Sequence, residues 1–178
     1  MNTHYLEKLE YNKILEKLSL YCMTYIGKTF AAELKPSLKK EQVKKMLNET
    51  LEAINLEIRK GNLPITEISD ISKSLKQLES NISLSAKNLL EIAHIFKLSR
   101  ELKDYFYKDE NFETENFPLL DNTFSNLYNN LELEKTIFSS ILDENTIADN
   151  ASSKLSSLRR NRRKLEADIK ESFNHILH

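Results

Sequence analysis

The chain has 178 residues, of which 40% are apolar, so it is long enough for one domain or one domain with an extension, and overall disorder is disfavoured. Its formal net charge is −1, which by itself points to no polyanionic partner, so only the distribution of charge is informative. With two Gly and three Pro, the chain lacks the turn residues that many short strands require. We predict an all-α fold.

Cysteine content and hydropathy predict the compartment. The single cysteine, Cys22, cannot form an internal disulfide and belongs to no metal-binding spacing, which favours a small buried side chain. The chain is charged from its first residues onward, and no run approaches the roughly 18 apolar residues of a membrane span. We therefore predict a cytoplasmic protein with no membrane partner.

Apolar residues at helical spacing predict four helical regions in the first two thirds of the chain. The first covers residues 5–34, with a break near Thr24 that makes it a helical hairpin ended by Pro36. Ser37 is the expected N-cap and Gly61 the expected left-handed C-cap of the next helix. A shorter helix over 68–78 and one that starts after Ser85 complete the set. We expect these helices to bury their apolar stripes against one another; the stripe of the second region is Val43, Leu47, Leu51, Ile54 and Ile58.

The segment from Tyr107 to Pro118 is acidic and lacks helical periodicity, which predicts an exposed loop. Leucines and Phe124 then recur over residues 119–133 and predict one further helix, leading into an acidic turn at Asp143. Apolar pairs on both sides of the turn sequence DENT predict a very short hairpin.

The last predicted helix runs from Leu155 for about six turns, along one apolar stripe. Neither Gly nor Pro follows it, so we expect it to belong to a longer element. An exposed stripe of this size tends to be covered by another copy of the chain. We expect self-association through the distal residues of the stripe, which are Leu165, Ile169, Phe173 and Ile176.

Residues for catalysis or for binding a cofactor are not recognisable. A phosphate-binding loop needs clustered glycines, and Gly27 and Gly61 are isolated. The four histidines contain no H-E-x-x-H pattern, and the acidic residues alternate with lysines as they do on solvated helix faces. We predict no catalytic, cofactor or metal residue, and no enzyme activity, in this chain.

Five basic residues within six positions are the one feature typical of binding to a polyanion, and they are Arg159, Arg160, Arg162, Arg163 and Lys164. Spread around a helix, several of them are able to reach a phosphate backbone in a sequence-independent, salt-sensitive contact. The alternative is that they pair with Glu166, with Asp168 or with acids of the 143–149 turn and stabilise the helix. The sequence leaves both open.

Three stretches of the chain resemble the bacterial MutS-II family, MutS paralogues without the mismatch-reading domains. They read LEKLEYNKILEKLSLYCMTYIGKTFAAELKP, ETLEAINLEIRKGNLPITEISDISKSLKQLE and ILDENTIADNASSKLSSLRRNRRKL. The most specific features are the Asp143-Glu144 turn and the Arg159-Arg160 pair. Asn145 stands where the family favours glycine, and asparagine also tolerates the left-handed conformation expected there.

The resemblance implies a helical core domain of the MutS type over residues 1–132, and a connector turn with the first lever or clamp helix over 133–178. It implies a cytoplasmic, homodimeric parent protein that uses ATP and Mg²⁺, carries an endonuclease domain in most members, and acts on branched DNA or on ribosomes. In the parent, this segment relays ATPase motion to a clamp on DNA or rRNA, in recombination suppression or rescue of collided ribosomes. The ATP and nuclease sites lie outside residues 1–178. The alternative is a free-standing helical adaptor that binds a partner protein through an apolar groove.

Overall fold

The computed structural model describes residues 6, 8–109 and 111–177, except for the side chains of residues 175–177. In this part of the chain, helices dominate and the one sheet has two short strands, which confirms the predicted all-α class. The helices are α2 (Tyr11–Leu20), α3 (Tyr25–Glu33), α4 (Lys40–Lys60), α5 (Ser72–Glu79), α6 (Ala86–Tyr107), η1 (Thr114–Asn116), α7 (Pro118–Ser125), α8 (Leu131–Ser140) and α9 (Ser153–Leu177). The strands are β1 (Ile141–Asp143) and β2 (Thr146–Ile147).

Helices α2 and α3 form the predicted hairpin, with the break where the sequence indicated it. The hydroxyl oxygen of Thr24 accepts a hydrogen bond from the Gly27 nitrogen at 3.0 Å and thereby caps α3. A β-carbon at Gly27 would lie 3.0 Å from the same Thr24 oxygen. Glycine therefore permits the tight first turn of α3.

The predicted caps of α4 are only partly correct. The helix begins at Lys40, and Ser37 in the preceding loop is not its N-cap. The Ser37 hydroxyl instead accepts from the Lys39 nitrogen (3.2 Å) and donates to the side chain of Gln42 in α4 (2.7 Å). Gly61 has the positive φ expected after the helix, 78°, but its ψ of −168° lies outside the left-handed helical region. Its carbonyl is free to accept from the Tyr105 hydroxyl at 2.6 Å.

The expectation that all apolar stripes are buried is wrong for α4. Val43 is 37% exposed, Leu47 64% and Ile58 77%, whereas the one buried side chain of this helix is Leu56, at 1%. Ile26 and Phe30 of α3 are also exposed. In the described part of the chain, other elements pack on the Leu56 side of α4, so its sequence stripe faces solvent.

Helix α6 is the central element. Ser85 is its N-cap as predicted, since its hydroxyl oxygen accepts from the Asn88 nitrogen at 3.2 Å. The helix is buried along its length, from Ile92 and Ala93 near one end to Phe106 near the other. The shorter α5 before it starts at Ser72, after the predicted position of Ile68, because Asp70 accepts from the Ser72 nitrogen (2.9 Å) in the preceding turn.

The acidic segment after α6 is not the simple exposed loop that its composition predicts. Phe117 is 2% exposed and stacks on Phe112 with ring centroids 5.0 Å apart. These aromatic rings anchor the segment to the core despite the acids around them. Pro118 does not end the segment but starts α7 at its first helical position, where proline is favoured.

The helix predicted over residues 119–133 is two helices. Helix α7 ends at Ser125, and Asn130 starts α8 by accepting a hydrogen bond from the Leu133 nitrogen at 3.0 Å. The N-terminus of α7 has no cap of its own. The carboxylate of Glu52 on α4 accepts from the nitrogens of Leu119 and Leu120, both at 3.0 Å.

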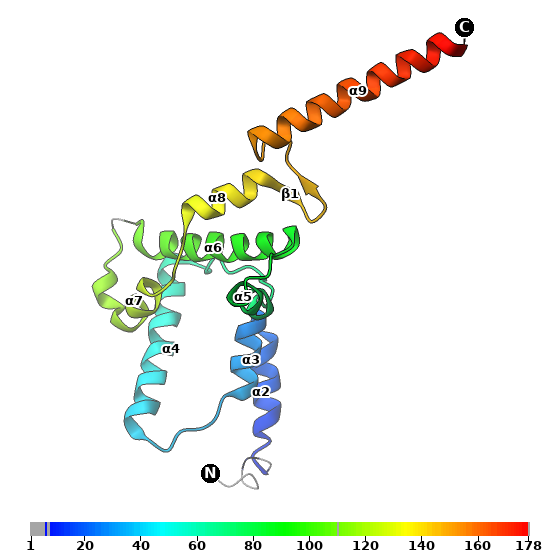
Figure 1. The fold of residues 1–178 in the computed structure, drawn as a ribbon. Helices are drawn as coiled ribbons and strands as arrows, with labels where there is room; N and C mark the ends of the chain where they lie inside the picture. Colours follow the sequence, from blue (N-terminus) through cyan, green and yellow to red (C-terminus); the bar gives the residue numbers. More distant parts are fainter. Residues whose placement is uncertain (1–5, 7, 110, 178) are drawn as a thin grey trace.

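Two buried clusters hold α6 to its neighbours. Leu56, Phe106, Phe117 and Phe124 join α4, α6 and α7, and the rings of Phe106 and Phe124 stack with centroids 4.4 Å apart. Ala93, Ile137 and Ile141 join α6, α8 and β1. Figure 1 shows the result: α8 lies along α6, α4 and the α2–α3 hairpin extend from one side of it, and α9 projects from the other.

The molecule exposes much more surface than a compact protein of its size. Its accessible surface is 14100 Å². A compact monomer of 20.8 kDa would expose about 9000 Å². Part of the excess belongs to the projecting α9, and part to the exposed apolar faces of α2, α3 and α4.

Candidate functional site

The candidate site is the base of α9, where the predicted hairpin is present. Strands β1 and β2 pair antiparallel, with Ile141 opposite Ile147. The Asp143 carboxylate accepts a hydrogen bond from the Asn145 nitrogen at 2.8 Å. This bond has the largest effect in lowering the pKa of Asp143, and a hydrogen bond from the Thr146 side chain has the next largest. Among the described non-glycine residues, a positive φ occurs at Glu10 and Asn81. Asn145 therefore does not adopt the left-handed conformation that was expected there. The Asp143 carboxylate holds the turn instead.

The hairpin is attached firmly to α6. Ile141 is 6% exposed and packs in the second cluster, with Ile147 against it. The Ala148 nitrogen donates to the Ser140 carbonyl at 2.9 Å. At the tip of the hairpin, Lys87 of α6 lies 3.2 Å from Glu144. The orientation of the hairpin is therefore fixed by apolar packing, with an exposed ion pair at its edge.

Asp149 connects the hairpin to α9. Its carboxylate accepts hydrogen bonds from both Arg159 and Arg163, which lie four residues apart and hence on one side of the helix. Arg159 also donates to the Ile147 carbonyl at 2.8 Å. The hydrogen bonds from Arg159 and then Arg163 lower the pKa of Asp149. The start of α9 is thus tied to the strand that precedes it.

The other basic residues of the predicted run differ from this pair. Arg162 lies 3.1 Å from Glu166, one turn further along α9, in an exposed pair. Arg160 and Lys164 are exposed and form no ion pair with any residue that the structure describes. At about 100° per residue they share one face of α9. The structure therefore divides the basic run into three groups. Arg159 and Arg163, the bracing pair, bind Asp149, and Arg162 binds Glu166. Arg160 and Lys164 are called the open pair.

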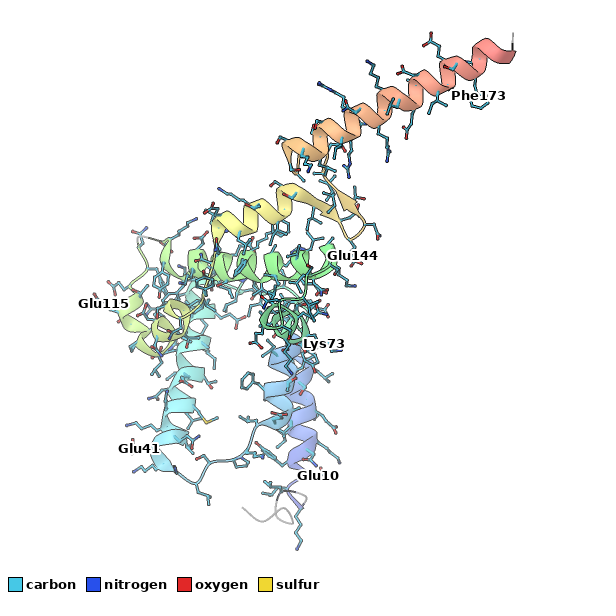
Figure 2. The ribbon with its side chains drawn as sticks, in the orientation of Figure 1. Glu10, Glu41, Lys73, Glu115, Glu144 and Phe173 are labelled. Carbon is cyan, nitrogen blue, oxygen red and sulfur yellow. The ribbon has the colours of Figure 1, made fainter. Side chains whose placement is uncertain are left out.

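The apolar stripe of α9 faces solvent. Leu165, Ile169 and Phe173 are each more than half exposed, and the side chain of Ile176 lies outside the described residues. Figure 2 shows Phe173 near the distal end of α9, with no other described element beside it. The stripe is available for a contact that the described chain does not supply.

One polar connection in the packed region was not predicted. Arg100 of α6 donates to both carboxylate oxygens of Glu134 on α8, at 2.7 and 3.1 Å, and Glu134 is 5% exposed. The hydrogen bond from Arg100 lowers the pKa of Glu134, and its counterpart raises the pKa of Arg100. Both residues lie in sequences where charges alternate, so no local signal distinguishes them from solvated ones.

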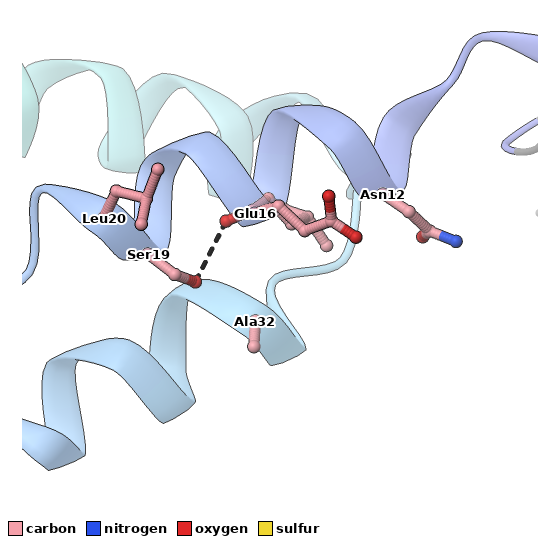
Figure 3. A pocket seen from close by; sticks show the side chains of 6 residues that line it. Asn12, Glu16, Ser19, Leu20 and Ala32 are labelled. Atoms are coloured by element: carbon pink, nitrogen blue, oxygen red, sulfur yellow. Dashed lines mark hydrogen bonds between the residues drawn. The ribbon is translucent and has the colours of Figure 1, made fainter.

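Other possible sites have few side chains that could catalyse a reaction or bind a metal ion. The hollow between α2 and α3 has a volume of 470 Å³, and Figure 3 shows Ser19 in its wall, with the hydroxyl donating to the Leu15 carbonyl at 2.9 Å. Glu16 is its one ionisable lining residue, so it lacks a pair of groups for acid–base catalysis. The described residues contain no metal-binding cluster of three or more His, Cys, Asp or Glu. No described helix is long and apolar enough to cross a membrane.

Together these features define an all-α chain in which a packed helical unit carries one long projecting helix, α9, whose first turns are rich in arginine and lysine. No protein-family model matches the sequence. Curated relatives named Endonuclease MutS2 do match: one from Ruminiclostridium cellulolyticum is 36% identical over 95% of this chain, one from Acetivibrio thermocellus 34% over 99%, and one from Lactobacillus johnsonii 34% over 98%.

The resemblance to the MutS-II family found in the sequence is confirmed: the chain is homologous to a segment of the MutS2 family. It spans only 21% to 22% of the length of these relatives. The relationship therefore applies to this segment and not to the whole length of those proteins.

Proposed function

We propose that this chain is the helical core and first lever helix of a longer MutS2-like protein, with residues 1–132 as core and residues 133–178 as connector and lever. In that protein it relays motion from an ATPase that binds ATP and Mg²⁺ to a clamp on nucleic acid. The parent is a cytoplasmic homodimer and an endonuclease that acts on branched DNA or on ribosomes. The match covers 21% and 22% of the length of two relatives, which supports a longer protein, and their name, Endonuclease MutS2, supports the endonuclease part of the proposal.

The observation that carries the proposal is the brace at the base of α9. A relay requires that a displacement of the core reach the helix without being absorbed by a flexible connector. Ile141 fixes the hairpin to α6, and Asp149 ties the hairpin to Arg159 and Arg163. The helix beyond this brace extends away from the core (Figure 1). These contacts favour a rigid arm.

The open pair on α9 supports the nucleic-acid part of the proposal. Arg160 and Lys164 are exposed and form no ion pair with any residue that the structure describes. Each phosphate that a cation contacts releases condensed counterions, so such binding weakens as salt rises. Contacts of this kind carry no sequence information, which suits a clamp that holds branched DNA or rRNA by its backbone.

The test compares two double variants of the full-length protein, one that removes the open pair and one that removes the bracing pair. Arg160→Gln with Lys164→Gln should weaken binding to branched DNA or ribosomes and reduce the slope of log affinity against log salt by about 2, at about 0.9 per contact. The melting temperature should stay unchanged. Arg159→Gln with Arg163→Gln is the matched control, and it should uncouple ATP hydrolysis from clamp movement. Unchanged binding in the first variant would refute the nucleic-acid contact.

A protein-binding adaptor is the second candidate, favoured by the exposed apolar stripes of α4 and α9. The gene sequence downstream of the codon for His178 distinguishes the two candidates. A Walker A sequence, G-x-x-x-x-G-K-[ST], encoded there supports the relay. A stop codon shortly after His178 supports the adaptor.

We also propose that the 178-residue chain self-associates through the α9 stripe, because Leu165, Ile169 and Phe173 are exposed together. Ile169→Asp should shift sedimentation toward monomer. Leu142→Asp on the hairpin should not, although Leu142 is 65% exposed and Ile169 is 58%. A monomer at high concentration for the unchanged chain would contradict this proposal.

A further inference from the structure

The exposed stripe of α4 forms one side of an apolar hollow. Val43 and Leu47 line two adjoining spaces, of 300 and 370 Å³. Leu34 and Tyr11 line the first, and Leu38 lines the second. We call these spaces together the α4 hollow.

The walls of the α4 hollow are held in place by hydrogen bonds. The Tyr11 hydroxyl of α2 donates to the Leu34 carbonyl at 3.2 Å, which ties the loop after α3 to α2. Ser37 in the same loop donates to Gln42 of α4 at 2.7 Å. The hollow therefore lies between elements that are already connected, so an occupant would not have to order them.

The rim of the α4 hollow is basic. Lys35 lines the first space, and Lys40 and Lys44 line the second, whereas neither space has an acidic lining residue. Apolar walls with a positive rim match an amphipathic helix whose flanks are acidic. A nucleic acid would satisfy the lysines but would leave Leu38, 84% exposed, and Leu47 in water.

The chain leaves more surface exposed than its own described elements cover, and part of this surface is the apolar face of α4. The chain exposes about 5000 Å² more than a compact monomer would. The match covers 22% of the Acetivibrio thermocellus relative, so more than three quarters of such a chain lies elsewhere. Helix α9 projects from the opposite side of α6 (Figure 1) and is not placed to fill the hollow.

We propose that the α4 hollow receives an amphipathic helix with acidic flanks, from the part of the same longer polypeptide that lies outside residues 1–178. This inference rests on the proposed function only in requiring that longer polypeptide. The helix lies along Val43, Leu47 and Leu51, whose spacing of four residues repeats once per turn on one face of α4. Its acidic residues pair with Lys35, Lys40 and Lys44.

The first experiment measures access to position 47. Leu47→Cys is labelled with a maleimide in the 178-residue chain and in the full-length protein, and the peptide that contains residue 47 is quantified by mass spectrometry. Labelling should be at least ten-fold slower in the full-length protein. Leu142→Cys is the matched control, since Leu142 is 65% exposed and Leu47 is 64%. Equal labelling rates at position 47 in the two proteins would overturn the proposal.

The second experiment identifies the occupant and its charge. A photo-cross-linking residue at position 47 of the full-length protein should give a cross-link within one chain, to a peptide with acids beside apolar residues at helical spacing. Lys44→Glu should at least halve its yield, and Lys45→Glu should not, because Lys45 lies outside the hollow and pairs with Glu49. A cross-link to a second copy or to another protein would overturn the proposal. Neither readout depends on nucleic-acid binding, so a full-length protein that gave the cross-link but did not bind nucleic acid would refute only the proposed clamp contact.

Discussion

Helices α4 and α6 are almost equal in length, 21 and 22 residues, but they differ in how they are buried. Helix α6 buries five residues along its length. Helix α4 buries one, Leu56, and leaves Leu47 and Ile58 largely in solvent. The sequence of α4 nevertheless shows the more regular apolar stripe. An amphipathic pattern therefore predicts that a helix forms and which face needs a partner, but not whether the partner is present.

The difference follows from the neighbours of each helix. Helix α6 is covered by α7, α8 and β1, so apolar residues on several of its faces are removed from water. Helix α4 contacts α7 through a side of the helix that its stripe does not predict, with Leu56 and Glu52. The stability of the described chain should therefore depend on α6 and on this one side of α4.

The largest expected effect is near the C-terminal end of α6. Phe106→Ala removes a fully buried ring that stacks on Phe124 and should lower the free energy of unfolding by about 3–5 kcal/mol. Ile58→Ala on α4 is the control, because Ile58 is 77% exposed and its truncation should change the value by less than about 0.5 kcal/mol. Urea denaturation measures both. Similar losses in the two variants would show that the α4 stripe is buried in solution.

A smaller effect is expected between α6 and α8. Glu134→Gln weakens two hydrogen bonds from Arg100 and should cost about 1–3 kcal/mol near neutral pH. Because Arg100 lowers the pKa of Glu134 below its ordinary value of 4.5, the ion pair stabilises the fold above that value, and the stabilisation is lost as pH falls through the lowered pKa.

The difference in unfolding free energy between the unchanged chain and Glu134→Gln should therefore be constant from neutral pH to about 5 and shrink at lower pH. Urea denaturation at several pH values measures it. Glu144→Gln on the hairpin, which affects the exposed pair with Lys87, is the control and should show little pH dependence in this range. A difference that grows on acidification would be inconsistent with a lowered pKa at Glu134.

The smallest effect concerns the contacting side of α4. Glu52→Ala removes the cap of α7 and should lower the free energy of unfolding by about 1–2 kcal/mol, while alanine keeps α4 helical. Glu49→Ala, which removes only an exposed pair with Lys45, should change it by less than about 0.5 kcal/mol. Equal values for the two variants would mean that Glu52 does not cap α7 in solution.

The sequence by itself determined the features that depend on neighbours along the chain. The break near Thr24, the cap at Ser85 and the hairpin over residues 141–147 all depend on contacts within a few residues. The helical class follows from the scarcity of Gly and Pro, and the resemblance to a segment of MutS2 proteins follows from motifs that are contiguous in the chain. Asp149 pairing with the basic run was one of two alternatives that the sequence left open.

Only the tertiary structure decided the features that depend on residues distant in the sequence. Glu52 caps the start of α7 by accepting from the nitrogen of Leu119, which lies 67 residues further along the chain. Arg100 and Glu134, which form an ion pair, are 34 residues apart. Phe117 is buried although its surroundings are acidic, because aromatic rings from other elements lie against it. Composition and periodicity average over neighbours in the chain, whereas burial and ion pairing depend on which elements meet in space. That is why a single charge, such as Glu134, is indistinguishable in the sequence from a solvated one.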